Sequence, residues 1–341
     1  MRSKKFNHRI EFRKYAGPLF FFLITFPYLS YSHELFKFRQ ISMGTVVEIA
    51  LIGENQEKAE KAALKGFHEI RRIEQLMSPK IESGDVFRIN QSAGNEWVEV
   101  SPETLHVIKK SIDISERSEG GFDITVGPLI ELWQRARAKG YPPSEEDLKK
   151  SLDLVSFRNI LIHQGGKIFL KKGEMSIDLG GIAKGYAVDK AFEVLKNLGY
   201  KNLIVNIGGD LRAGGLKWGQ PWTIGIQNPR IPEKIMAKIS IGEGAMATSG
   251  DYEKYFIYEG KRYHHLLNPK NGLPAEACQS VTILSKEGMI SDALSTAVFV
   301  LGPEKGYSLC QRIGGMECLI VDQEGKIILS PGLKDRFSFM P

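Results

Sequence analysis

The sequence lacks most of the signatures by which common enzyme classes are recognised. It contains no Gly-x-Ser-x-Gly nucleophile elbow, no Walker P-loop and no dinucleotide-binding fingerprint. Its three cysteines, Cys278, Cys310 and Cys318, lack the spacing of a structural zinc site. An odd number of cysteines also excludes a complete disulfide framework, so we expect buried thiols, although Cys310 and Cys318 could pair. No internal repeat or low-complexity linker divides the chain.

The body of the protein also lacks an excess of positive charge. The chain has 46 Lys and Arg residues against 40 Asp and Glu, which gives a formal net charge of +6. Five of these six net charges belong to residues 1–14, so the rest of the chain is almost neutral. We therefore expect no interface for nucleic acid.

Only one long hydrophobic run is present, and it lies near the N-terminus. Residues 15–32 carry no charge and follow the basic head, which is the layout of an export signal. The run is at the lower limit for a membrane-spanning helix and contains Pro18 and Pro27. We predict that residues 1–32 are a signal peptide cleaved after Ser32, with an uncleaved membrane anchor as the alternative. No cysteine follows the run, so a lipid anchor is not expected.

The remaining residues, 33–341, have the composition of a folded domain. Apolar residues make up 42% of the chain and charged residues 25%, which is enough to build a sizeable core. Periodicity predicts helices over 55–77, from 101 to near 120, over 187–198 and over 290–301. It predicts strands over 38–51, 97–100, 202–207, 223–227, 237–241 and 281–284, and hairpins over 159–171 and 318–329. Strands in adjacent runs with helices between them favour an α+β fold.

The stretch from Ser176 to Asp189 is the first candidate for chemistry. A short apolar run, 177–179, reads as a strand and leads into Gly180, Gly181 and Lys184 before the helix. Paired glycines allow a ligand to approach the backbone, and free N–H groups at a helix start suit phosphate. Lys184 would add a positive charge there. The alternative is an ordinary strand–turn–helix link with a salt-bridged lysine.

A second candidate lies at the start of the last long helix. Asp292 and Thr296 are four residues apart, so both face the same side of the helix. One carboxylate with hydroxyl and carbonyl oxygens suits a hard cation such as Mg²⁺. The alternative is that Asp292 stabilises the first turn and Thr296 bonds within the helix.

Two further segments carry polar groups next to turns. His265 precedes a tight turn at 268–272 and could act as a base or an acid near neutral pH, or be a surface strand histidine. Thr248 to Asp251 offers hydroxyls on an expected loop, which could contact phosphate or simply form a turn.

Taken in order, these motifs resemble the ApbE family of flavin transferases, and the resemblance runs from Phe38 to Leu329. No single motif is decisive, but eight in the family's order are highly specific. They are the segments 43–45, 77–79 with Asn90, 121–133, 178–186, 206–210, 247–250, 265–272 and 291–296.

The resemblance implies a single T-fold-like α+β unit of antiparallel sheets with packed helices. It also implies that FAD is bound with Mg²⁺ and that FMN is moved onto a serine or threonine of a target flavoprotein, releasing AMP. By position, the FAD site would contain Met43, Gly121, Phe122, Asp123, Asp178, Lys184, Thr248 and Leu266. Asp292, Ser295, Thr296 and the carbonyl near Gly181 would hold Mg²⁺, and His265 would activate the acceptor hydroxyl beside the catalytic Asp292.

One position departs from the family pattern. Lys80 stands where the family usually has a tyrosine that contacts the adenine end of FAD. A Mg²⁺-dependent FAD pyrophosphatase and a non-enzymatic flavin-binding protein therefore remain alternatives to the transferase. For the transferase, export implies a periplasmic or membrane-anchored enzyme on the outer face of the inner membrane, with a membrane redox complex or a periplasmic flavoprotein as acceptor.

Overall fold

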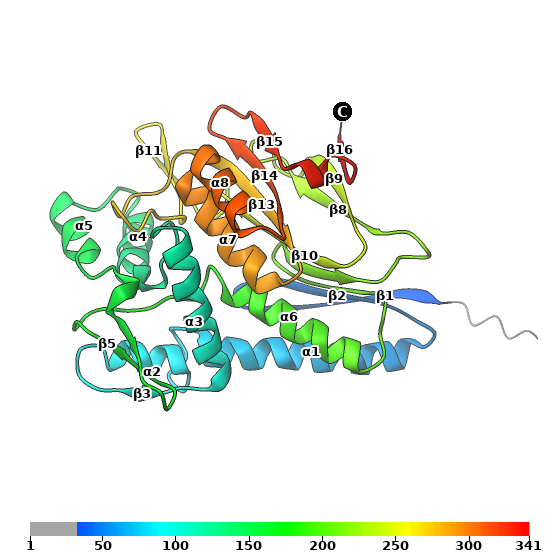
Figure 1. The fold of residues 1–341 in the computed structure, drawn as a ribbon, viewed down its shortest axis with the longest axis horizontal. Coiled ribbons are helices and arrows are strands. Elements are labelled where there is room, and N and C mark those ends of the chain that lie inside the picture. Colours follow the sequence, from blue (N-terminus) through cyan, green and yellow to red (C-terminus); the bar gives the residue numbers. More distant parts are fainter. Residues whose placement is uncertain (1–32, 341) are drawn as a thin grey trace, which may run out of the picture. The chain divides into compact units, whose positions relative to one another are not determined.

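A large antiparallel sheet organises the part of the chain that the computed structural model describes, residues 33–340. Its eight strands follow the order β1-β2-β6-β7-β10-β13-β14-β15 (Figure 1). The strands are β1 (Glu34–Ser42), β2 (Thr45–Gly53), β6 (Leu203–Ile207), β7 (Asp210–Gly214), β10 (Gly244–Gly250), β13 (Cys278–Ser285), β14 (Glu317–Asp322) and β15 (Ile327–Leu329). All neighbouring pairs run antiparallel, as the family resemblance implied.

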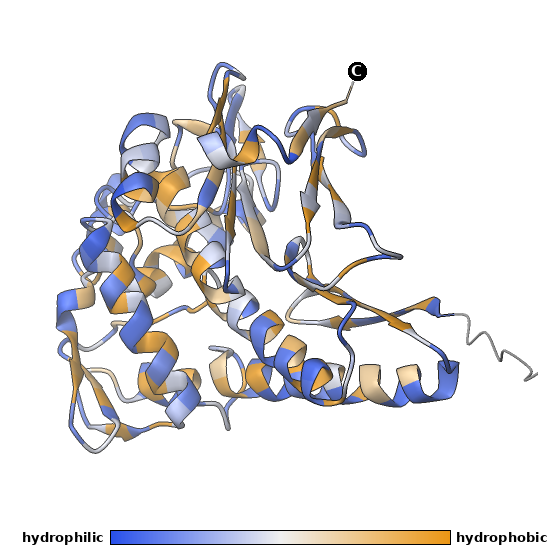
Figure 2. Cartoon of the chain, turned by 45° about the vertical axis from the view of Figure 1, so that its right-hand side comes forward, coloured by the Kyte–Doolittle hydropathy of each residue, from blue (hydrophilic) through white to orange (hydrophobic). Residues whose placement is uncertain are grey.

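Helices cover one face of this sheet. They are α1 (Gln56–Met77), α6 (Ala183–Asn197), α7 (Gly288–Leu301) and α8 (Pro303–Ile313). Helix α6 lies alongside α1 and α7, and α7 packs on β10 and β13 (Figure 1). Hydrophilic and hydrophobic residues alternate around these helices (Figure 2), and the apolar sides, with Phe67 and Phe192 among them, form the main core.

A smaller sheet covers part of the opposite face. Its strands are β8 (Trp222–Gln227), β9 (Ile235–Ile241) and β16 (Phe337–Phe339), in the order β16-β9-β8. Trp222 and Ile239 pack with Leu284 and Leu319 of the large sheet in a second core. Successive side chains of β10 and β13 therefore face different surroundings, which becomes important for Thr248 and Ser249.

The remaining elements are shorter and lie outside these two sheets and four helices. The helices are α2 (Asp85–Gln91), α3 (Pro102–Arg117), α4 (Gly127–Lys139) and α5 (Glu145–Leu152). The strands β3 (Val98–Glu99), β4 (Ile160–Ile162) and β5 (Lys167–Leu170) form a small sheet, and β11 (Phe256–Tyr258) and β12 (Lys261–Tyr263) form a hairpin. Short 3₁₀ turns lie at 124–126, 157–159 and 331–333. A third apolar cluster joins α4 to the β11–β12 hairpin through Trp133, Phe256 and Tyr263.

Most expected elements are confirmed, but three local predictions are wrong. The single strand predicted over 38–51 is a hairpin, because Met43 and Gly44 both have positive φ, 53° and 71°, and turn the chain. Residues 177–179 are extended without strand partners, since the side chain of Asn90 bonds to the N–H and C=O of Ile177. Thr248 belongs to strand β10 rather than to a loop.

The expectation for the cysteines is confirmed, whereas the one for the N-terminal segment is not tested. Cys278, Cys310 and Cys318 are buried free thiols, as predicted. The predicted signal or anchor, 1–32, lies outside the described residues. Within 33–340, none of the helices combines the length and the hydrophobicity needed to cross a bilayer.

Candidate functional site

The glycine-rich bend before α6 is held by side chains as well as by backbone. Asp178 Oδ1 accepts a hydrogen bond of 2.7 Å from the N–H of Gly180, and burial raises the pKa of this carboxyl although Lys254 and Lys80 lower it. A Cβ added to Gly181 would lie 3.2 Å from the ring of Phe122 and 3.4 Å from Thr296 Oγ1. The bend therefore passes directly against α7.

Helices α6 and α7 meet at two glycines. A Cβ on Gly185 would lie 2.2 Å from the carbonyl oxygen of Gly288, and one on Gly288 would lie 2.6 Å from the carbonyl oxygen of Gly185. Only residues without a side chain permit this approach. It brings the N–H of Gly185 to 2.9 Å from Asp292 Oδ2. Two segments more than 100 residues apart thus share one site.

Asp292 lies in a buried cluster of charges. Only 3% of the residue is exposed, and burial, with the nearby Asp210 carboxylate, raises its pKa to about 7 against the effects of Lys184 and the Gly185 N–H. Lys184 donates to Asp210 at the start of β7. Burial lowers the pKa of Lys184, but Asp210 and Asp292 outweigh this and raise it above its ordinary value. With both carboxylates ionised, one lysine would leave an excess of negative charge that a cation would offset.

Hydroxyl groups lie on the same side of α7 as Asp292. Ser249 Oγ of β10 is 2.8 Å from Ser295 Oγ and 3.3 Å from Thr296 Oγ1. Ser295 and Thr296 follow Asp292 by three and four residues, so the three side chains share a face of the helix. The cluster offers one carboxylate and three hydroxyl oxygens within a short stretch of structure.

The two adjacent histidines have different environments. His264 is buried, its Nε2 lies 2.8 Å from the Ala275 carbonyl, and its Nδ1 accepts from the N–H of Leu266 at 3.2 Å. Because a carbonyl only accepts and an N–H only donates, these bonds fix a neutral ring protonated on Nε2. His264 is therefore a satisfied core histidine.

His265 has the opposite tautomer and an open nitrogen. Its Nδ1 lies 3.1 Å from the carbonyl of Glu253, so Nδ1 carries the proton and Nε2 keeps a lone pair. Desolvation lowers the pKa of His265, and the charges of Lys254 and Lys184 lower it further. The residue is exposed, so a neutral, accepting Nε2 is reachable from solvent.

Stability should depend on pH through His264. Burial lowers the pKa of His264 in the folded protein, whereas the unfolded chain protonates near its ordinary value of about 6.5. The unfolded state then binds more protons, so we expect the free energy of unfolding to fall as pH drops below about 6.5, by up to about 1.4 kcal/mol per pH unit. Urea unfolding at several pH values should show a shallower dependence for His264→Asn than for the wild type. An unchanged dependence would contradict this assignment.

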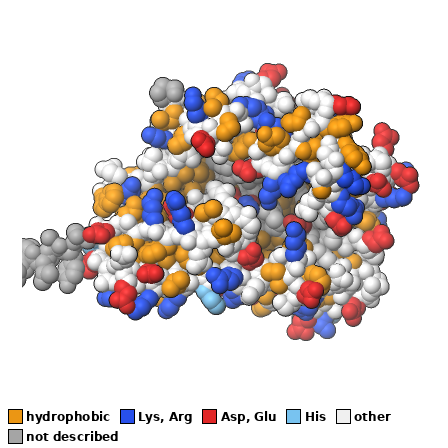
Figure 3. Space-filling model, turned by 180° about the vertical axis from the view of Figure 1, so that it is seen from behind, with side chains coloured by type: hydrophobic (Ala, Val, Ile, Leu, Met, Phe, Trp, Pro, Cys, Tyr) orange, Lys and Arg blue, Asp and Glu red, His pale blue; other side chains and the backbone are white. Residues whose placement is uncertain are grey.

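A cleft of about 320 Å³ lies next to His265. Its aromatic wall contains Trp133, Phe256 and Tyr263, whose rings stack with centroids 5.6 Å (Trp133–Tyr263) and 5.3 Å (Phe256–Tyr263) apart. The side chains of Lys80, Arg137 and Lys254 complete the rim. A space-filling view shows a hollow with Lys and Arg side chains gathered along its edge (Figure 3).

The turn at Met43 is strained. A non-glycine residue at φ 53° is uncommon and costs free energy. Glu74 of α1 offsets this cost, because it accepts from the N–H of Met43 at 2.8 Å and from the hydroxyl of Ser42 at 2.5 Å.

The sequence of this region matches a known family. The sequence model of the ApbE family matches residues 43–320, which span the bend, the hydroxyl cluster, both histidines and Asp292. This chain belongs to the ApbE family.

Relatives of this ApbE chain include enzymes of known activity. It is 35% identical over 248 residues to a FAD:protein FMN transferase of Vibrio cholerae, covering 71% of this chain and 74% of that one. The solved ApbE protein of Thermotoga maritima matches with a TM-score of 0.82 and 36% identity, over 89% of this chain and 99% of that one. The flavin transferase ApbE of Vibrio cholerae matches with a TM-score of 0.79 and 29% identity, over 89% and 100%.

Most residues predicted for the ApbE site lie in one region. The bend with Asp178, Gly181 and Lys184 meets Asp292 and Thr296 of α7 through the contacts above. Phe122 packs on Gly181, and Gly121 lies against Leu301, which a Cβ there would approach to 2.7 Å. Leu266 is buried beside His265.

Two predicted ligand residues use their side chains elsewhere. The carboxylate of Asp123 accepts from the N–H and hydroxyl of Thr125 at 2.8 and 2.6 Å and from the N–H of Phe157 at 2.8 Å, so it caps a 3₁₀ turn. Thr248 Oγ1 pairs with Thr282 Oγ1 at 2.9 Å, across from it in β13. Because side chains alternate along a strand, Ser249 rather than Thr248 faces α7.

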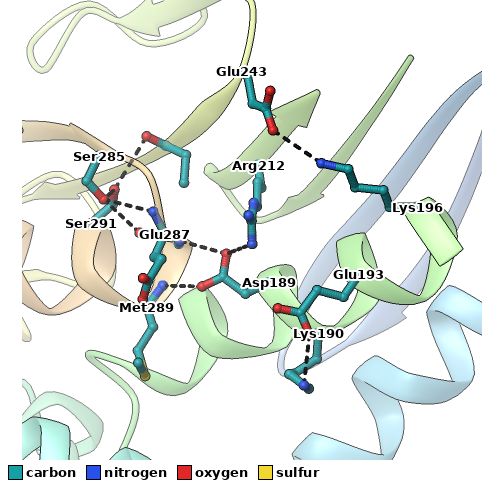
Figure 4. Close-up of polar contacts among 12 residues, drawn as sticks. Asp189, Lys190, Glu193, Lys196, Arg212, Glu243, Ser285, Glu287, Met289 and Ser291 are labelled. Atoms are coloured by element: carbon teal, nitrogen blue, oxygen red, sulfur yellow. Dashed lines mark hydrogen bonds and ion pairs between the residues drawn. The ribbon is translucent and has the colours of Figure 1, made fainter. Parts of the chain in front are cut away.

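Sequence reasoning gave no role to Asp210 or Asp189 and did not distinguish Ser249 from Thr248. Asp210 binds Lys184, Ser249 joins the hydroxyl cluster, and Asp189 of α6 accepts hydrogen bonds at the start of α7 (Figure 4). Asp210 follows a Gly–Gly turn after a strand and Asp189 ends the glycine-rich motif. Those positions could have marked them as candidates, but their partners only become neighbours in the fold.

Proposed function

We propose that this chain is a Mg²⁺-dependent FAD:protein FMN transferase that moves FMN onto a serine or threonine of an acceptor protein and releases AMP. The observation that supports it best is the buried Asp292, which faces the Gly185 N–H and the Lys184–Asp210 pair. His265, whose Nε2 keeps a lone pair, lies within range of the Lys184 charge. The names of the relatives support the same reaction.

The donor set around Asp292 fits a hard cation. Within residues 33–340, no group of three His, Cys, Asp or Glu side chains could hold a metal ion, so a cation here would need hydroxyl, carbonyl and substrate oxygens. That set is typical of Mg²⁺, which usually shares its ligands with water and phosphate. Asp292, Thr296, Ser295 and the Gly181 carbonyl would hold it. When bound, Mg²⁺ would neutralise charge on the pyrophosphate of FAD and on departing AMP.

The residues of the chain would position the phosphates and move one proton. His265 Nε2 takes the proton of the acceptor hydroxyl, whose oxygen then bonds to the phosphorus of the FMN half. The bond from that phosphorus to the bridging oxygen breaks, and AMP leaves with this oxygen. Lys184, held by Asp210, and the backbone of the glycine bend would orient the pyrophosphate.

The acceptor and the location are part of the proposal. An exported enzyme of this kind would act on a flavoprotein of a membrane redox complex or of the periplasm. The predicted N-terminal signal or anchor supports this placement.

Mass spectrometry of an acceptor domain tests the function. Purified protein, FAD and Mg²⁺ are incubated with an acceptor carrying a Ser/Thr-Gly-Ala-Thr-type site, and the acceptor is expected to gain the mass of one FMN. Free FMN and AMP formed without any modified acceptor would instead show an FAD pyrophosphatase. FAD recovered intact would show a flavin-binding protein.

Replacing His265 should slow FMN transfer without weakening FAD binding. We expect His265→Ala to slow FMN transfer by roughly 10²- to 10⁴-fold, because the hydroxyl loses its base, while the affinity for FAD changes little. Single-turnover transfer and flavin fluorescence titration measure the two quantities. The exposed His68 of α1 gives the control His68→Ala, which should match the wild type. Equal losses of transfer and FAD affinity would instead indicate a binding role for His265.

A further inference from the structure

The rim of the cleft next to His265 carries charge of one sign. The lining contains no Asp or Glu, and apart from the two histidines its charged side chains are Lys80, Arg137 and Lys254. In the described part of the chain, none of the three forms an ion pair with a carboxylate, whereas neighbouring Arg135 on α4 pairs with Glu131 at 2.9 Å. The cleft therefore attracts negatively charged groups.

Hydrogen bonds hold the aromatic wall and the adjacent backbone of the cleft in position. The indole Nε1–H of Trp133 donates to the carbonyl of Gly272 at 2.8 Å, which fixes the ring that stacks on Tyr263. Lys254 has φ 44°, and the preceding carbonyl of Glu253 is held by His265. An aromatic wall with a basic rim suits a peptide segment that combines acidic and apolar side chains.

We propose, on the basis of the transferase function above, that this cleft binds an acidic segment of the acceptor protein adjacent to the serine or threonine that receives FMN. The acceptor hydroxyl must reach His265 Nε2, and His265 lines the cleft. The pyrophosphate of FAD would lie on the other side of His265, around Lys184 and Asp292. Lys80 and Lys254 also act on Asp178 of the glycine-rich bend, so Arg137 of α4 is the rim cation that we assign to a carboxylate of the acceptor.

Charge reversal on α4 tests the cleft. We expect Arg137→Glu to raise the KM for the acceptor about tenfold at low salt, with FAD affinity as in the wild type, and to flatten the salt dependence of kcat/KM. Arg135→Glu, on the same helix but outside the cleft, should leave the KM for the acceptor unchanged. In the reciprocal arm, Asp and Glu residues flanking the acceptor site are changed to Asn and Gln, which should raise KM for the wild-type enzyme but not further for Arg137→Glu.

A failure of the acceptor-cleft proposal and a failure of the transferase function would give different results. An equal loss of FAD affinity in Arg137→Glu would assign the cleft to FAD and overturn the proposal, and so would an unchanged KM for the acceptor. A wild-type enzyme that never modifies the acceptor would overturn the proposed function instead.

A different observation supports a second inference, at the junction of α6 and α7. Helix α7 has no side-chain cap of its own. Asp189 of α6 takes that role, accepting from the N–H of Gly288 at 2.8 Å and of Met289 at 2.9 Å, and Arg212 of β7 donates to the same carboxylate at 3.0 Å (Figure 4). One buried carboxylate thus connects two helices and a strand.

This connection controls where Asp292 sits. Asp189 lies one turn after Gly185 on α6, and Asp292 lies one turn after Gly288 on α7. The contact between the two glycines and the Asp189 cap fix the helices against each other at both turns. We infer that Asp189 is a positioning residue for the cation and phosphate site.

The test compares metal dependence with stability. Asp189→Asn keeps the size but loses the charge, so we expect the Mg²⁺ concentration needed for FAD binding, followed by flavin fluorescence, to rise roughly 10- to 100-fold. Asp189→Glu should restore part of this loss. The control Glu193→Gln removes a surface pair with Lys190 on the same helix and should not change the Mg²⁺ dependence. A less stable Asp189→Asn protein with the wild-type Mg²⁺ dependence would show a purely structural role and overturn this inference.

Discussion

Replacing Asp292 by alanine is expected to reduce FMN transfer by a thousandfold or more (on the order of 4 kcal/mol of transition-state stabilisation) while the protein remains folded. Asp292 would supply the single carboxylate of the cation site. Its pKa is raised to about 7 by burial, so its ionised form is disfavoured in the folded protein. Removing the carboxylate therefore sacrifices little beyond its hydrogen bond with Gly185.

Three measurements check this expectation together. Transfer is followed by acceptor mass, Mg²⁺ dependence by flavin fluorescence, and folding by circular dichroism and urea unfolding. Asp113→Ala, which removes a surface carboxylate paired with Arg117, is the control and should retain activity. If Asp292→Ala keeps the Mg²⁺ dependence of the wild type, Asp292 is not a ligand of the cation.

Gly185→Ala is expected to destabilise the fold by roughly 3 kcal/mol or more, through overpacking of helix against helix. The added Cβ would lie 2.2 Å from the Gly288 carbonyl oxygen and 2.7 Å from Asp292 Cβ. Neither group is the flexible end of a side chain, so α6 and α7 would have to separate. That separation would also break the bond from Gly185 to Asp292.

Urea unfolding measures the loss, and another glycine provides the control. A Cβ added to Gly242 would meet no heavy atom within 4 Å, and the φ of this residue is not positive. Gly242→Ala should therefore be neutral or slightly stabilising. Wild-type stability in Gly185→Ala would mean that the helices approach less closely than the structure shows.

The sequence predicted the site where its geometry is local. The four-residue spacing of Asp292 and Thr296 defines a helix face without knowledge of the fold. The glycine pair before Lys184 was expected to let a ligand approach the backbone. The structure places Phe122 and Thr296 against Gly181, and the approach of a ligand there stays a prediction.

Features that depend on distant partners could not be predicted. Residues 177–179 look like a strand, but the amide of Asn90 takes the place of a neighbouring strand. The turn at Met43 needs Glu74 from α1 to hold an unfavourable φ. The choice between Thr248 and Ser249 depends on which face of β10 meets α7, and a shift of one residue reverses it.

The charge balance of the site could be predicted only in part. Lys184 was expected to face phosphate, with a salt-bridged lysine as the alternative, and β7 supplies Asp210 as the partner that the sequence did not name. The pair changes the electrostatics of the site. A lysine alone would attract the pyrophosphate, whereas Lys184 together with Asp210 and Asp292 would attract a cation.

The most direct test of the proposed function is the mass of the acceptor domain after incubation with FAD, with and without Mg²⁺, for the wild type and Asp292→Ala. We predict that the acceptor gains one FMN only with wild-type enzyme and Mg²⁺ together. An acceptor that gains FMN equally well with Asp292→Ala, or without Mg²⁺, would contradict a cation-dependent transfer at Asp292.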